Sequence, residues 1–517
     1  MKNAFIYAAI VTIGGFVFGL DAALISGTIK FITAEFGLTD LQVGAVVSAP
    51  GFGVLFALPV ASYLTNRFGR KSTLQLIAGL YVVSAIGSAF APSFEWLIAS
   101  RFLGGLAFTS LTLAAMYIGE IAPAKLRGKM VGMNQINIVV GLSAAYFINY
   151  FLLQALSSNA AWIAEYDLNK NIWRWMLGSE IIPAILWFVL LFFVPRSPRW
   201  LMLKGRVEEA KAVLQKILPA KEAEAELALI SNNLNVDGKE STLGDQLKIL
   251  LTPAFRLALI IGLTFAVVQQ VTGINAILFY APTVFEQLGG GTDTAFLQSV
   301  YVGLISVVGA GAALFFIDRI GRRPMTIGGL LWAVVSLLLC AYGFHSATYS
   351  LTADALIALP EALDVSKLQA LIGQEFGSDI AFKDALQQAL GAVDAKAFEG
   401  DLVKAAVNLP STLILFGVLS FIAAFQFSVG PIMWIVLSEI FSTKVRAIAI
   451  PVCAFLNSIV SWAIQQFFPW QLANMGARDI FIFYAVSTFI GLLILSKILP
   501  ETKNKTIEEI EMELQKG

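Results

Sequence analysis

The stretch QQVTGINAILFYAP, from Gln269 to Pro282, decides how this chain folds, because it places polar side chains where hydrocarbon is expected. It belongs to an apolar segment that opens near Phe255, yet it contains the three amides of Gln269, Gln270 and Asn275. Burying an amide without a partner costs roughly 2–7 kcal/mol. Three amides therefore predict a buried binding site for an uncharged solute that is rich in hydroxyl groups.

The composition is that of a polytopic membrane protein. Of the 517 residues, 57% are hydrophobic and only 14% are charged, whereas soluble domains have roughly 25% charged residues. The 35 Lys and Arg residues equal the 35 Asp and Glu residues in number, so no excess charge points to nucleic acid. Cys340 and Cys453 lie inside apolar runs, and His345 is the only histidine. No disulfide framework, metal site or cofactor is therefore expected, and the chain is predicted not to be an enzyme.

Segments of about 20 apolar residues, the length that crosses a bilayer, occur six times before Pro195 and six times after Pro253. They run near 5–29, 42–64, 72–92, 95–119, 128–152, 173–194, 255–285, 293–317, 323–343, 410–440, 447–470 and 478–499. The chain is therefore predicted to be an all-α membrane protein with twelve transmembrane helices in two six-helix halves, 1–194 and 253–499. Lys2 precedes an apolar run without a small-residue cleavage site, so a first span is expected there and not a removed signal peptide.

The segments outside the spans carry most of the charge. The linker 195–252 contains KGRVEEAKAVLQKIL, whose helical periodicity and opposite charges one turn apart predict cytoplasmic helices between the halves. Lys and Arg residues gather in this linker, in the tail 500–517 and in alternate loops, so both termini are expected in the cytoplasm. The polar stretch 345–408 falls on the other side, where ALPEAL and KDALQQAL predict a small helical insert.

Two motifs of the first half recur in the second half, at the matching loops. Arg67-Phe-Gly-Arg-Lys71 returns as Arg319-Ile-Gly-Arg-Arg323, and the motif Glu120 to Arg127 returns as Glu439 to Arg446. The recurring motifs are farther apart in the second half, and the insert supplies the extra chain. Two repeated halves with a site between them at the midplane are what an alternating-access transporter needs.

These motifs resemble those of the sugar porter family of the major facilitator superfamily, which includes bacterial sugar–proton symporters and animal glucose facilitators. The matching stretches are GFVFGLDAALISG (15–27), RFGRK (67–71), RFLGGLAF and YIGEIAPAKLRGKM (within 101–130), PRSPRWL (195–201), QQVTGINAILFY (269–280), DRIGRRP (318–324), GPIMWIVLSEIF (430–441) and PETK (500–503). They follow the family's order and cover the chain except for the insert. The resemblance therefore implies the major facilitator fold.

The resemblance also implies a sugar site in the middle of the bundle. The residues implied to contact the sugar or to line its cavity are Gln135, Gln269, Gln270, Asn275, Gln426, Trp434 and Asn457. Counting along the spans at about 1.5 Å per residue places several of these amides near the middle of the bilayer. Amides suit hydroxyl groups because each has two donors and an acceptor, and a ring suits the C–H face of a sugar. The alternative is that these amides only hold helices together.

Gly273 predicts a break in span 7. On a regular helix the side chains of Gln270 and Asn275 would point about 140° apart. Unwinding at Gly273 would let both face one watery cavity, where free backbone groups are tolerated. The outer part of the span is then expected to carry Phe279 and Tyr280 as a movable gate. The alternative for these two rings is the aromatic belt at the membrane interface.

Asp21 and Arg101 form a second candidate site. Asp21 is the only acid in an apolar first span, and Arg101 lies at a similar depth in span 4. The two are expected to pair, because breaking a buried ion pair strands a charge at a cost of about 3–5 kcal/mol. The resemblance implies more, since an aspartate here is typical of proton-coupled members of the family. Asp21 would take up the proton and release Arg101; the alternative is a purely structural ion pair.

A third group of charges lies in the predicted cytoplasmic loops and is called the latch here. Its members are Arg67, Arg70, Glu120, Arg127, Asp318, Arg322, Glu439 and Arg446. They are expected to bridge the two halves when the inner side is closed; the alternative is that they only fix the topology. The chain departs from the family pattern at Asn66, Arg196, Ser306 and Ser458, and Trp462 is a possible substitute ring for the site near Ser458.

Together these features predict a secondary active transporter that imports a monosaccharide with protons. It is expected in a bacterial inner membrane, as a functional monomer without a nucleic-acid partner. A facilitative sugar or polyol uniporter is the alternative within transport. A membrane-embedded sugar sensor is the alternative outside it. Which sugar is carried stays open, because Ser306 and Ser458 are smaller than the residues usual in the family.

Overall fold

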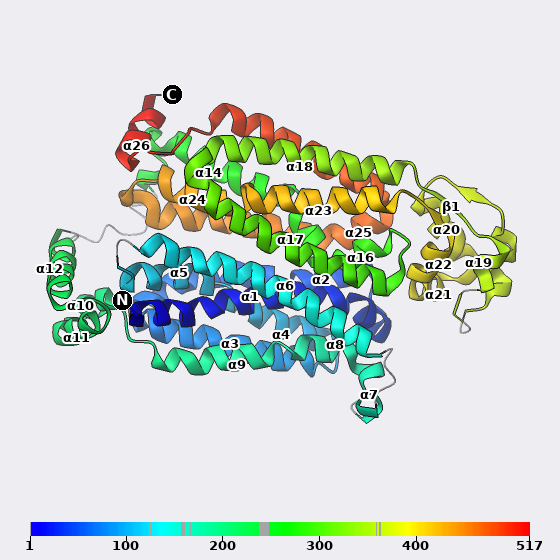
Figure 1. Cartoon of the computed structure of the whole chain (residues 1–517), viewed down its shortest axis with the longest axis horizontal. Helices are drawn as coiled ribbons and strands as arrows, with labels where there is room; N and C mark the ends of the chain where they lie inside the picture. Colours follow the sequence, from blue (N-terminus) through cyan, green and yellow to red (C-terminus); the bar gives the residue numbers. More distant parts are fainter. Residues whose placement is uncertain are drawn as a thin grey trace.

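A computed structural model describes residues 2–123, 126–156, 161–165, 167–236, 248–357, 359–360 and 363–516. Two sets of long helices lie side by side, the first half in blue to cyan and the second in green to red (Figure 1). The helices of the first half are α1 (Lys2–Phe36), α2 (Asp40–Phe68), α3 (Arg70–Ala89), α4 (Phe94–Ala107), α5 (Ser110–Ile121), α6 (Arg127–Leu156), α7 (Ala161–Glu165), α8 (Leu168–Gly178) and α9 (Ile181–Leu190).

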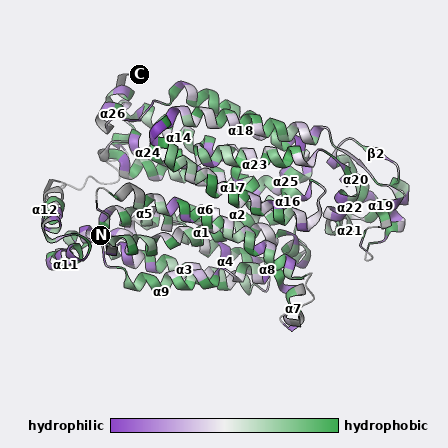
Figure 2. Cartoon of the chain, in the orientation of Figure 1, coloured by the Kyte–Doolittle hydropathy of each residue, from purple (hydrophilic) through white to green (hydrophobic). Residues whose placement is uncertain are grey.

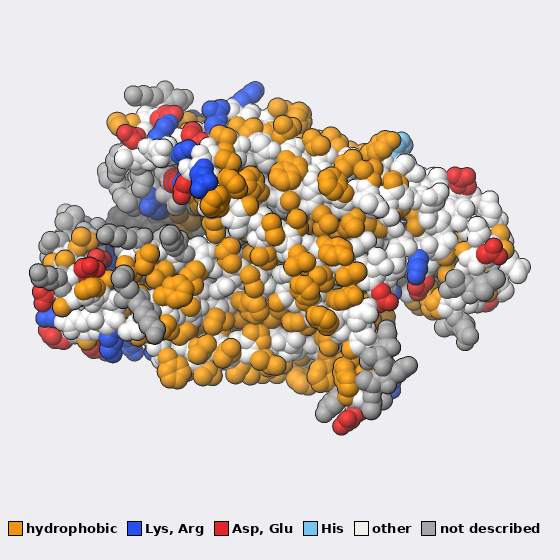
Figure 3. Space-filling model, in the orientation of Figure 1, with side chains coloured by type: hydrophobic (Ala, Val, Ile, Leu, Met, Phe, Trp, Pro, Cys, Tyr) orange, Lys and Arg blue, Asp and Glu red, His pale blue; other side chains and the backbone are white. Residues whose placement is uncertain are grey.

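The second half repeats this arrangement with more interruptions. Its helices are α14 (Pro253–Val271), α15 (Ile274–Phe279), α16 (Ala281–Glu286), α17 (Gly291–Ile320), α18 (Arg322–His345), α23 (Ser411–Phe427), α24 (Val429–Ile440) and α25 (Thr443–Ile498). Most residues along these helices are hydrophobic (Figure 2). Hydrophobic side chains cover the middle of the visible face of the bundle (Figure 3). Charged side chains gather toward the two ends, as expected of a bundle whose sides face lipid.

Eleven helices of the described chain are long and apolar enough to cross a membrane. The last of them, Ile448–Ile498, has 51 residues, which is far more than one crossing needs. Gly476 interrupts it with a φ of 77°. The Tyr484 hydroxyl donates to Gln471 Oε1 at 3.3 Å, although these residues would lie about 20 Å apart along one continuous helix. The chain therefore reverses at Gly476, so this segment is long enough for the last two of the twelve predicted spans.

The two ends of the bundle carry different additions. Both termini, α26 (Ile507–Lys516) and the linker helices α10 (Pro198–Leu203), α11 (Val207–Ile217) and α12 (Ala220–Val236) lie at one end, called the linker end here (Figure 1). The helices predicted for the linker are therefore present. Trp200 Nε1 donates to the Asn66 carbonyl at 3.2 Å, and the Tyr117 hydroxyl donates to the Pro195 carbonyl at 2.8 Å, which ties the linker to the first half.

The insert forms a separate lobe at the opposite end, called the insert end (Figure 1). It contains α19 (Ala353–Ile357), α20 (Asp379–Leu390), α21 (Ala392–Ala397), α22 (Glu399–Ala406), the 3₁₀ helix η2 (Val365–Leu371) and the strands β1 (Thr348–Ser350), β2 (Glu375–Phe376) and β3 (Val407–Asn408). The strands make an antiparallel sheet in the order β2-β1-β3. Tyr349 stacks on Phe382 at 5.6 Å inside the lobe's own apolar core.

The insert is therefore helical only in part, because a small sheet accompanies its helices. KDALQQAL is helical, within α20, but the described residues of ALPEAL, which are Leu359, Pro360 and Leu363, lie in bends and irregular chain. The other ALPEAL residues lie outside the described chain. Thr348 pairs with Asn408, so the small sheet joins the points where the chain enters and leaves the lobe. Such a closing pair is a long-range feature that helical periodicity does not reveal.

The two halves contact each other toward the insert end. Ser48 Oγ donates to Gln466 Oε1 at 2.8 Å, and Gln466 Nε2 donates to the Leu41 carbonyl at 2.9 Å. The Tyr146 hydroxyl donates to the Leu278 carbonyl at 2.5 Å. Within the described chain, the hydrogen bonds between the halves all lie on this side of the bundle. The structure is therefore closed at the insert end.

Replacing Gly44 by Ala is expected to weaken this closure. A Cβ atom at Gly44 would lie 1.9 Å from the Gln466 carbonyl oxygen. Overpacking typically costs about 1–3 kcal/mol, so closure should become roughly tenfold less favourable. Ser299 reports on it, because it is 1% exposed on α17, one turn from Gly303, whose Cβ would lie 2.7 Å from Ser143 of the other half. A cysteine at Ser299 should react faster with a water-soluble maleimide in the Gly44→Ala background.

Gly311→Ala, in the same Ser299→Cys background, is the matched control. Gly311 also lies on α17, and a Cβ atom there would meet nothing within 4 Å. This variant should label at the parent rate. Equal labelling in the Gly44→Ala and Gly311→Ala proteins would contradict the steric account of closure.

Candidate functional site

The predicted break in span 7 is present. Helix α14 ends at Val271, and α15 begins at Ile274. Gly273 between them has a φ of 83°, in the left-handed region that residues with a Cβ atom disfavour. A Cβ atom here would also lie 2.6 Å from the ring of Tyr484. Backbone freedom and close packing therefore both require glycine at this hinge.

Gln269 and Gln270, at the end of α14, share hydrogen bonds with Asn457 of α25. Gln270 Nε2 donates to Asn457 Oδ1 at 3.2 Å and to Gln269 Oε1 at 3.3 Å. Asn457 Nδ2 donates to Gln269 Oε1 at 2.9 Å and to the Ala266 carbonyl at 2.9 Å. Gln269 Nε2 donates to the Gly430 carbonyl at 3.0 Å, which adds α24 to the set. All three side chains are buried.

Asn275, in the first turn of α15, joins the same network. Its Nδ2 atom donates to Gln270 Oε1 at 2.8 Å and to Ser461 Oγ at 2.8 Å. A regular helix would have kept Gln270 and Asn275 apart, so the hinge at Gly273 brings them together as expected. The four amides and Ser461 are called the amide network here.

The amide network can serve a hydroxyl-rich ligand through its acceptors. Each NH₂ group of the network already donates within the protein. Asn275 is only half-buried, and its Oδ1 atom accepts no hydrogen bond within the described chain. A ligand hydroxyl can donate to this oxygen, and further hydroxyls can exchange with the bonds among the amides. In this closed state the amides hold α14, α15, α24 and α25 together, and their contact with a ligand stays a prediction.

Three other residues predicted for the site lie apart from the network in this state. Gln135 is half-buried on α6 and makes no hydrogen bond within the described chain. Gln426 is buried on α23, where it packs against Gly309 of α17. Trp434, on α24, is 39% exposed. Hydrogen bonds to the amide network are absent for all three among the described residues, so their contact with a ligand stays a prediction.

The residues that depart from the family pattern make local contacts. Ser306 and Ser458 donate to carbonyls one turn earlier on their own helices, at 2.8 and 2.9 Å. The Trp462 ring lies 5.8 Å from Phe52 of the other half, and its suggested role as a substitute ring near Ser458 stays a prediction. Arg196 lies 5.4 Å over the Trp200 ring in the linker.

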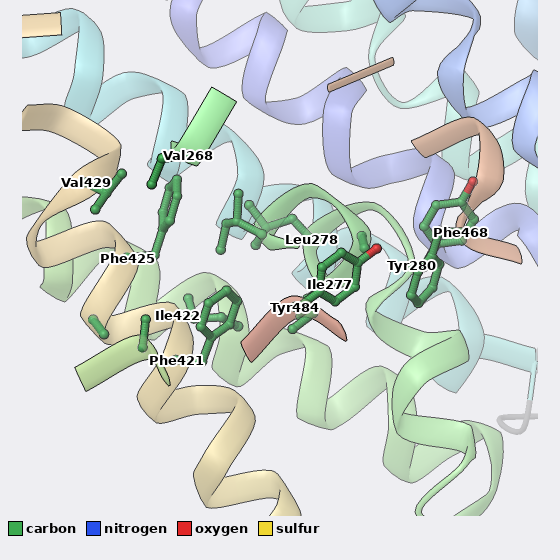
Figure 4. Packing of buried hydrophobic residues seen from close by; sticks show 14 of the residues in the cluster. Val268, Ile277, Leu278, Tyr280, Phe421, Ile422, Phe425, Val429, Phe468 and Tyr484 are labelled. Carbon is green, nitrogen blue, oxygen red and sulfur yellow. The ribbon is translucent and has the colours of Figure 1, made fainter. Parts of the chain in front are cut away.

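The predicted gate residues lie at the closed insert end. The Tyr280 hydroxyl donates to the Gln465 carbonyl at 2.6 Å, and its ring lies 5.0 Å from Phe468. Figure 4 shows Ile277, Tyr280, Phe468 and Tyr484 gathered around this segment. Tyr280 is 1% exposed and Phe279 is half-buried. A ring buried in this way is not part of an exposed aromatic belt, and the role of Tyr280 as a gate stays a prediction.

Asp21 and Arg101 form the predicted buried pair. Arg101 Nη1 lies 3.0 Å from Asp21 Oδ1, with side-chain exposures of 1% and 7%. Arg101 Nε donates to the Val46 carbonyl at 3.0 Å. Asp21 Oδ2 and Arg101 Nη2 have no hydrogen-bond partner within the described chain. The pair is thus incompletely satisfied, which is costly in a low-dielectric interior and is typical of groups that change partner.

Sequence analysis missed a second acid at this pair, Glu180. It lies at the break between α8 and α9, is 4% exposed and interacts with both Asp21 and Arg101. Two buried carboxyl groups then face one guanidinium, so only one negative charge is balanced unless a proton is bound. The signal was available, because Glu180 is an acid within an apolar span, as Asp21 is.

The latch residues pair within their own halves in this structure. Arg70 bonds Glu120 at 2.7 Å, and the equivalent Arg322 bonds Glu439 at 2.9 Å. The other described latch residues contact near neighbours: Arg67 with Tyr63, Asp318 with Arg322, and Arg446 with the Phe441 carbonyl. The side chain of Arg127 lies outside the described part. Bridging between the halves is therefore a prediction for the opposite state.

Two halves of membrane helices, a polar network at a helix hinge of the second half and a buried acid–guanidinium pair are the features of a membrane transporter of the alternating-access class. The family model described as "Sugar (and other) transporter" matches residues 7–358 and 398–514. The chain belongs to this family of sugar transporters, within the major facilitator superfamily. Residues 359–397, inside the insert lobe, lie outside the match.

Individual relatives cover nearly the whole chain. The arabinose–proton symporter of Bacillus subtilis is 31% identical over 501 residues, which is 96% of this chain and 92% of that protein. The D-xylose–proton symporter of Escherichia coli is 31% identical over 538 residues, with 97% and 94% covered. A structure of the xylose transporter XylE from E. coli, in a partially occluded inward-open conformation, matches with a TM-score of 0.74 at 28% identity. It covers 98% of this chain and 100% of that one.

Replacing Gly273 by Ala is expected to destabilise the protein and impair its hinge. A left-handed backbone costs a residue with a Cβ atom roughly 1–2 kcal/mol, and the contact with the Tyr484 ring adds to this. Gly205→Ala is the matched control, because Gly205 has a φ of 74° with nothing within 4 Å of a Cβ atom. The thermal unfolding midpoint in detergent should fall further for Gly273→Ala than for Gly205→Ala. Equal decreases would mean that packing against Tyr484 is unimportant.

Proposed function

We propose that this chain is a secondary active transporter that imports a monosaccharide together with protons by alternating access. The observation that carries the proposal is the joint presence of an uncharged amide network at a helix hinge and a buried acid–guanidinium pair. The network suits a neutral ligand with many hydroxyl groups. The buried acids suit a proton, because ionisable groups inside a membrane commonly form proton relays. The names of the arabinose and xylose symporters support both parts.

The orientation follows from the basic residues. Lys and Arg gather in the linker and in the loops at the linker end, so this end faces the cytoplasm. The insert lobe is then outside, and a bacterial inner membrane fits the relatives. The chain works as a monomer in this proposal. The structure, closed at the insert end, corresponds to the inward-facing stage of the cycle.

In the transport cycle, the hinge at Gly273 serves sugar binding and gate movement, and the buried acids serve proton binding. A sugar hydroxyl donates to Asn275 Oδ1, and Trp434, Gln135 and Gln426 approach the ligand as the halves close around it. Movement at Gly273 then carries Tyr280 toward or away from the other half. A proton on Asp21 or Glu180 changes which carboxyl holds Arg101, and this changes the balance between outward and inward states. The latch residues bridge the halves when the linker end closes.

A facilitative sugar or polyol uniporter is the competing function. A uniporter has no need of a second buried carboxyl group at the Asp21–Arg101 pair. Adding sugar to lightly buffered cells that express the protein separates the two. Alkalinisation of the medium with uptake supports symport, and uptake without any pH change supports the uniporter. A competition panel of monosaccharides against one labelled sugar then identifies the substrate, and absence of uptake or competition for every sugar would exclude a sugar transporter.

Asp21→Asn is expected to abolish uphill accumulation while equilibrium exchange continues. The amide keeps an acceptor for Arg101 but removes the titrating group. Because Arg101 loses one of its two carboxyl partners and keeps Glu180, the folded state should lose less than the roughly 3–5 kcal/mol of a fully broken buried pair. Proteoliposomes with an imposed proton gradient measure accumulation, and counterflow without a gradient measures exchange. Accumulation by the Asp21→Asn variant at the parent level would exclude proton coupling through Asp21.

Glu180→Gln tests the second acid in the same two assays. It should reduce accumulation and shift its pH profile, since one of the two carboxyl groups facing Arg101 no longer titrates. Glu95→Gln is the control, because Glu95 is exposed in the first turn of α4 and should behave as the parent. A purely structural role for Glu180 would instead lower accumulation and exchange equally without a shift in the pH profile.

A further inference from the structure

We propose that Glu286 is a second proton-binding group of this transporter, which takes up a proton from the outside and thereby favours closure of the insert end. Glu286 is the last residue of α16, the short helix that follows the gate residue Tyr280. It lies where α1, α17 and the insert lobe meet. The inference rests on the proposed function for the direction of the membrane and for the opening of the insert end.

A small polar cluster joins the two halves at Glu286. Lys30, on α1 of the first half, donates to Thr292 Oγ1 at 2.8 Å and lies 3.9 Å from Glu286 Oε1. Thr292 Oγ1 in turn donates to Glu286 Oε1 at 3.0 Å. The Glu286 side chain is 16% exposed and that of Lys30 is 38% exposed. When the insert end opens, α1 and α16 must separate, so Glu286 loses Lys30 and gains water, while Thr292 of its own half stays beside it.

The insert lobe adds negative charge to the same place. Gly400 lies against Glu286, and a Cβ atom there would be 3.6 Å from the carboxyl carbon. Glu399 and Asp401, on either side of Gly400, both act on Glu286 electrostatically. The family model does not match residues 359–397, and its second segment begins at 398, just before these acids. The lobe thus places two like charges beside a group that is already enclosed.

Contacts with the second half hold the lobe in this position. Asp379 Oδ2 accepts from the backbone N–H of Ala477, at the reversal of α25, at 3.2 Å. Lys383, one turn later on α20, donates to Gln287 Oε1 at 2.9 Å and pairs with Glu399 at 2.7 Å. Helix α20 therefore spans from the α25 reversal to the residue after Glu286. The acids of α22 cannot swing away from Glu286 without breaking these contacts.

The groups around Glu286 shift the pKa of its carboxyl in opposite directions. Burial raises the pKa of the Glu286 carboxyl, while Lys30 of α1 and the Thr292 hydroxyl lower it. Glu399 and Asp401 of α22 raise the pKa again, and the resulting pKa of Glu286 lies above its ordinary value. The remaining charged groups nearby are Lys383 of α20, which pairs with Glu399, and Lys404 of α22, which lies against Gly291.

The sign of the pH effect follows from linkage. Burial is the largest cause of the raised pKa and exceeds the opposing effect of Lys30. Glu286 therefore binds a proton more tightly in the closed state than in an open state, where water reaches the carboxyl and its pKa falls toward the ordinary value near 4.3. Acid outside therefore favours closure. The advantage is full below the ordinary pKa and is lost as the pH rises through the raised pKa of the closed state. A protonated Glu286 keeps its contact with Thr292 and no longer opposes the acids of the lobe.

The test uses Ser299→Cys in the full-length protein, reconstituted in nanodiscs without sugar. The rate of labelling by a water-soluble maleimide is measured from pH 8 to pH 5. Each rate is divided by that of a Gln388→Cys protein, whose cysteine is exposed on α20, to remove the pH dependence of the thiol reaction. The normalised rate should fall with acid, by at most about tenfold per pH unit for a single group.

Glu286→Gln in the Ser299→Cys background should label slowly at every pH, because glutamine resembles the protonated carboxyl. Glu95→Gln, at an exposed carboxyl near the same end, should label as the parent at every pH. Retention of the parent pH dependence in the Glu286→Gln protein would overturn the proposal. A pH-independent parent would overturn it as well.

Asp401→Asn supplies a second variant if Glu286→Gln fails to fold. It removes one like charge but leaves the pair between Lys383 and Glu399 in place. The midpoint of the labelling profile should move to lower pH, and an unchanged midpoint would overturn the role of the lobe. Because labelling requires neither sugar nor transport, its outcome is independent of the counterflow assay. If the parent protein shows no sugar counterflow but its labelling depends on pH as expected, the proposed function is contradicted and the proton site at Glu286 is still supported.

Discussion

The left-handed backbone at Gly273 is the constraint on which the rest of the site depends. It ends α14 after the two glutamines and turns α15 so that Asn275 bonds Gln270 at 2.8 Å. The same break places Tyr280 over the Gln465 carbonyl of α25. The amide network and the Tyr280 contact therefore depend on one pivot, and α25 is the partner of both. If a ligand binds at Asn275, as proposed, its pull would act on the segment that carries Tyr280.

Much of the fold and part of the site could be predicted from sequence. The spans, the break at Gly273 and the Asp21–Arg101 pair depend on local rules, namely apolar length, glycine geometry and the cost of a lone buried charge. The sheet in the insert, the partners of Tyr280 and the position of Trp462 could not be predicted. These depend on contacts between segments far apart in the chain. Glu180 was predictable in part. Its place inside an apolar span could be seen in the sequence, but its contact with Asp21 and Arg101 of other spans could not.

The two halves use their repeated charges in the same way. Arg70 with Glu120 and Arg322 with Glu439 are equivalent pairs, and each glutamate also accepts from a hydroxyl just beyond its half. Those hydroxyls belong to Ser197 at the start of the linker and Thr502 in the tail. The linker and the tail therefore lie at equivalent positions on the two halves. This symmetry explains why two unlike segments both lie at the linker end.

Closure at the linker end is predicted to reuse these same glutamates. In the present state each bonds an arginine and a hydroxyl of its own side. A carboxylate has about four lone-pair sites, so each can accept a further donor from the other half, and any exchange of partners is expected to begin with the weaker bond. Since Ser197 and Thr502 are neutral, giving up one of their bonds costs only about 0.5–1.5 kcal/mol. Losing a buried arginine partner would cost more, about 3–5 kcal/mol. The bonds from Ser197 of the linker and Thr502 of the tail are therefore expected to break before the arginine pairs do. Changes in the linker or the tail should then shift the equilibrium between the two states.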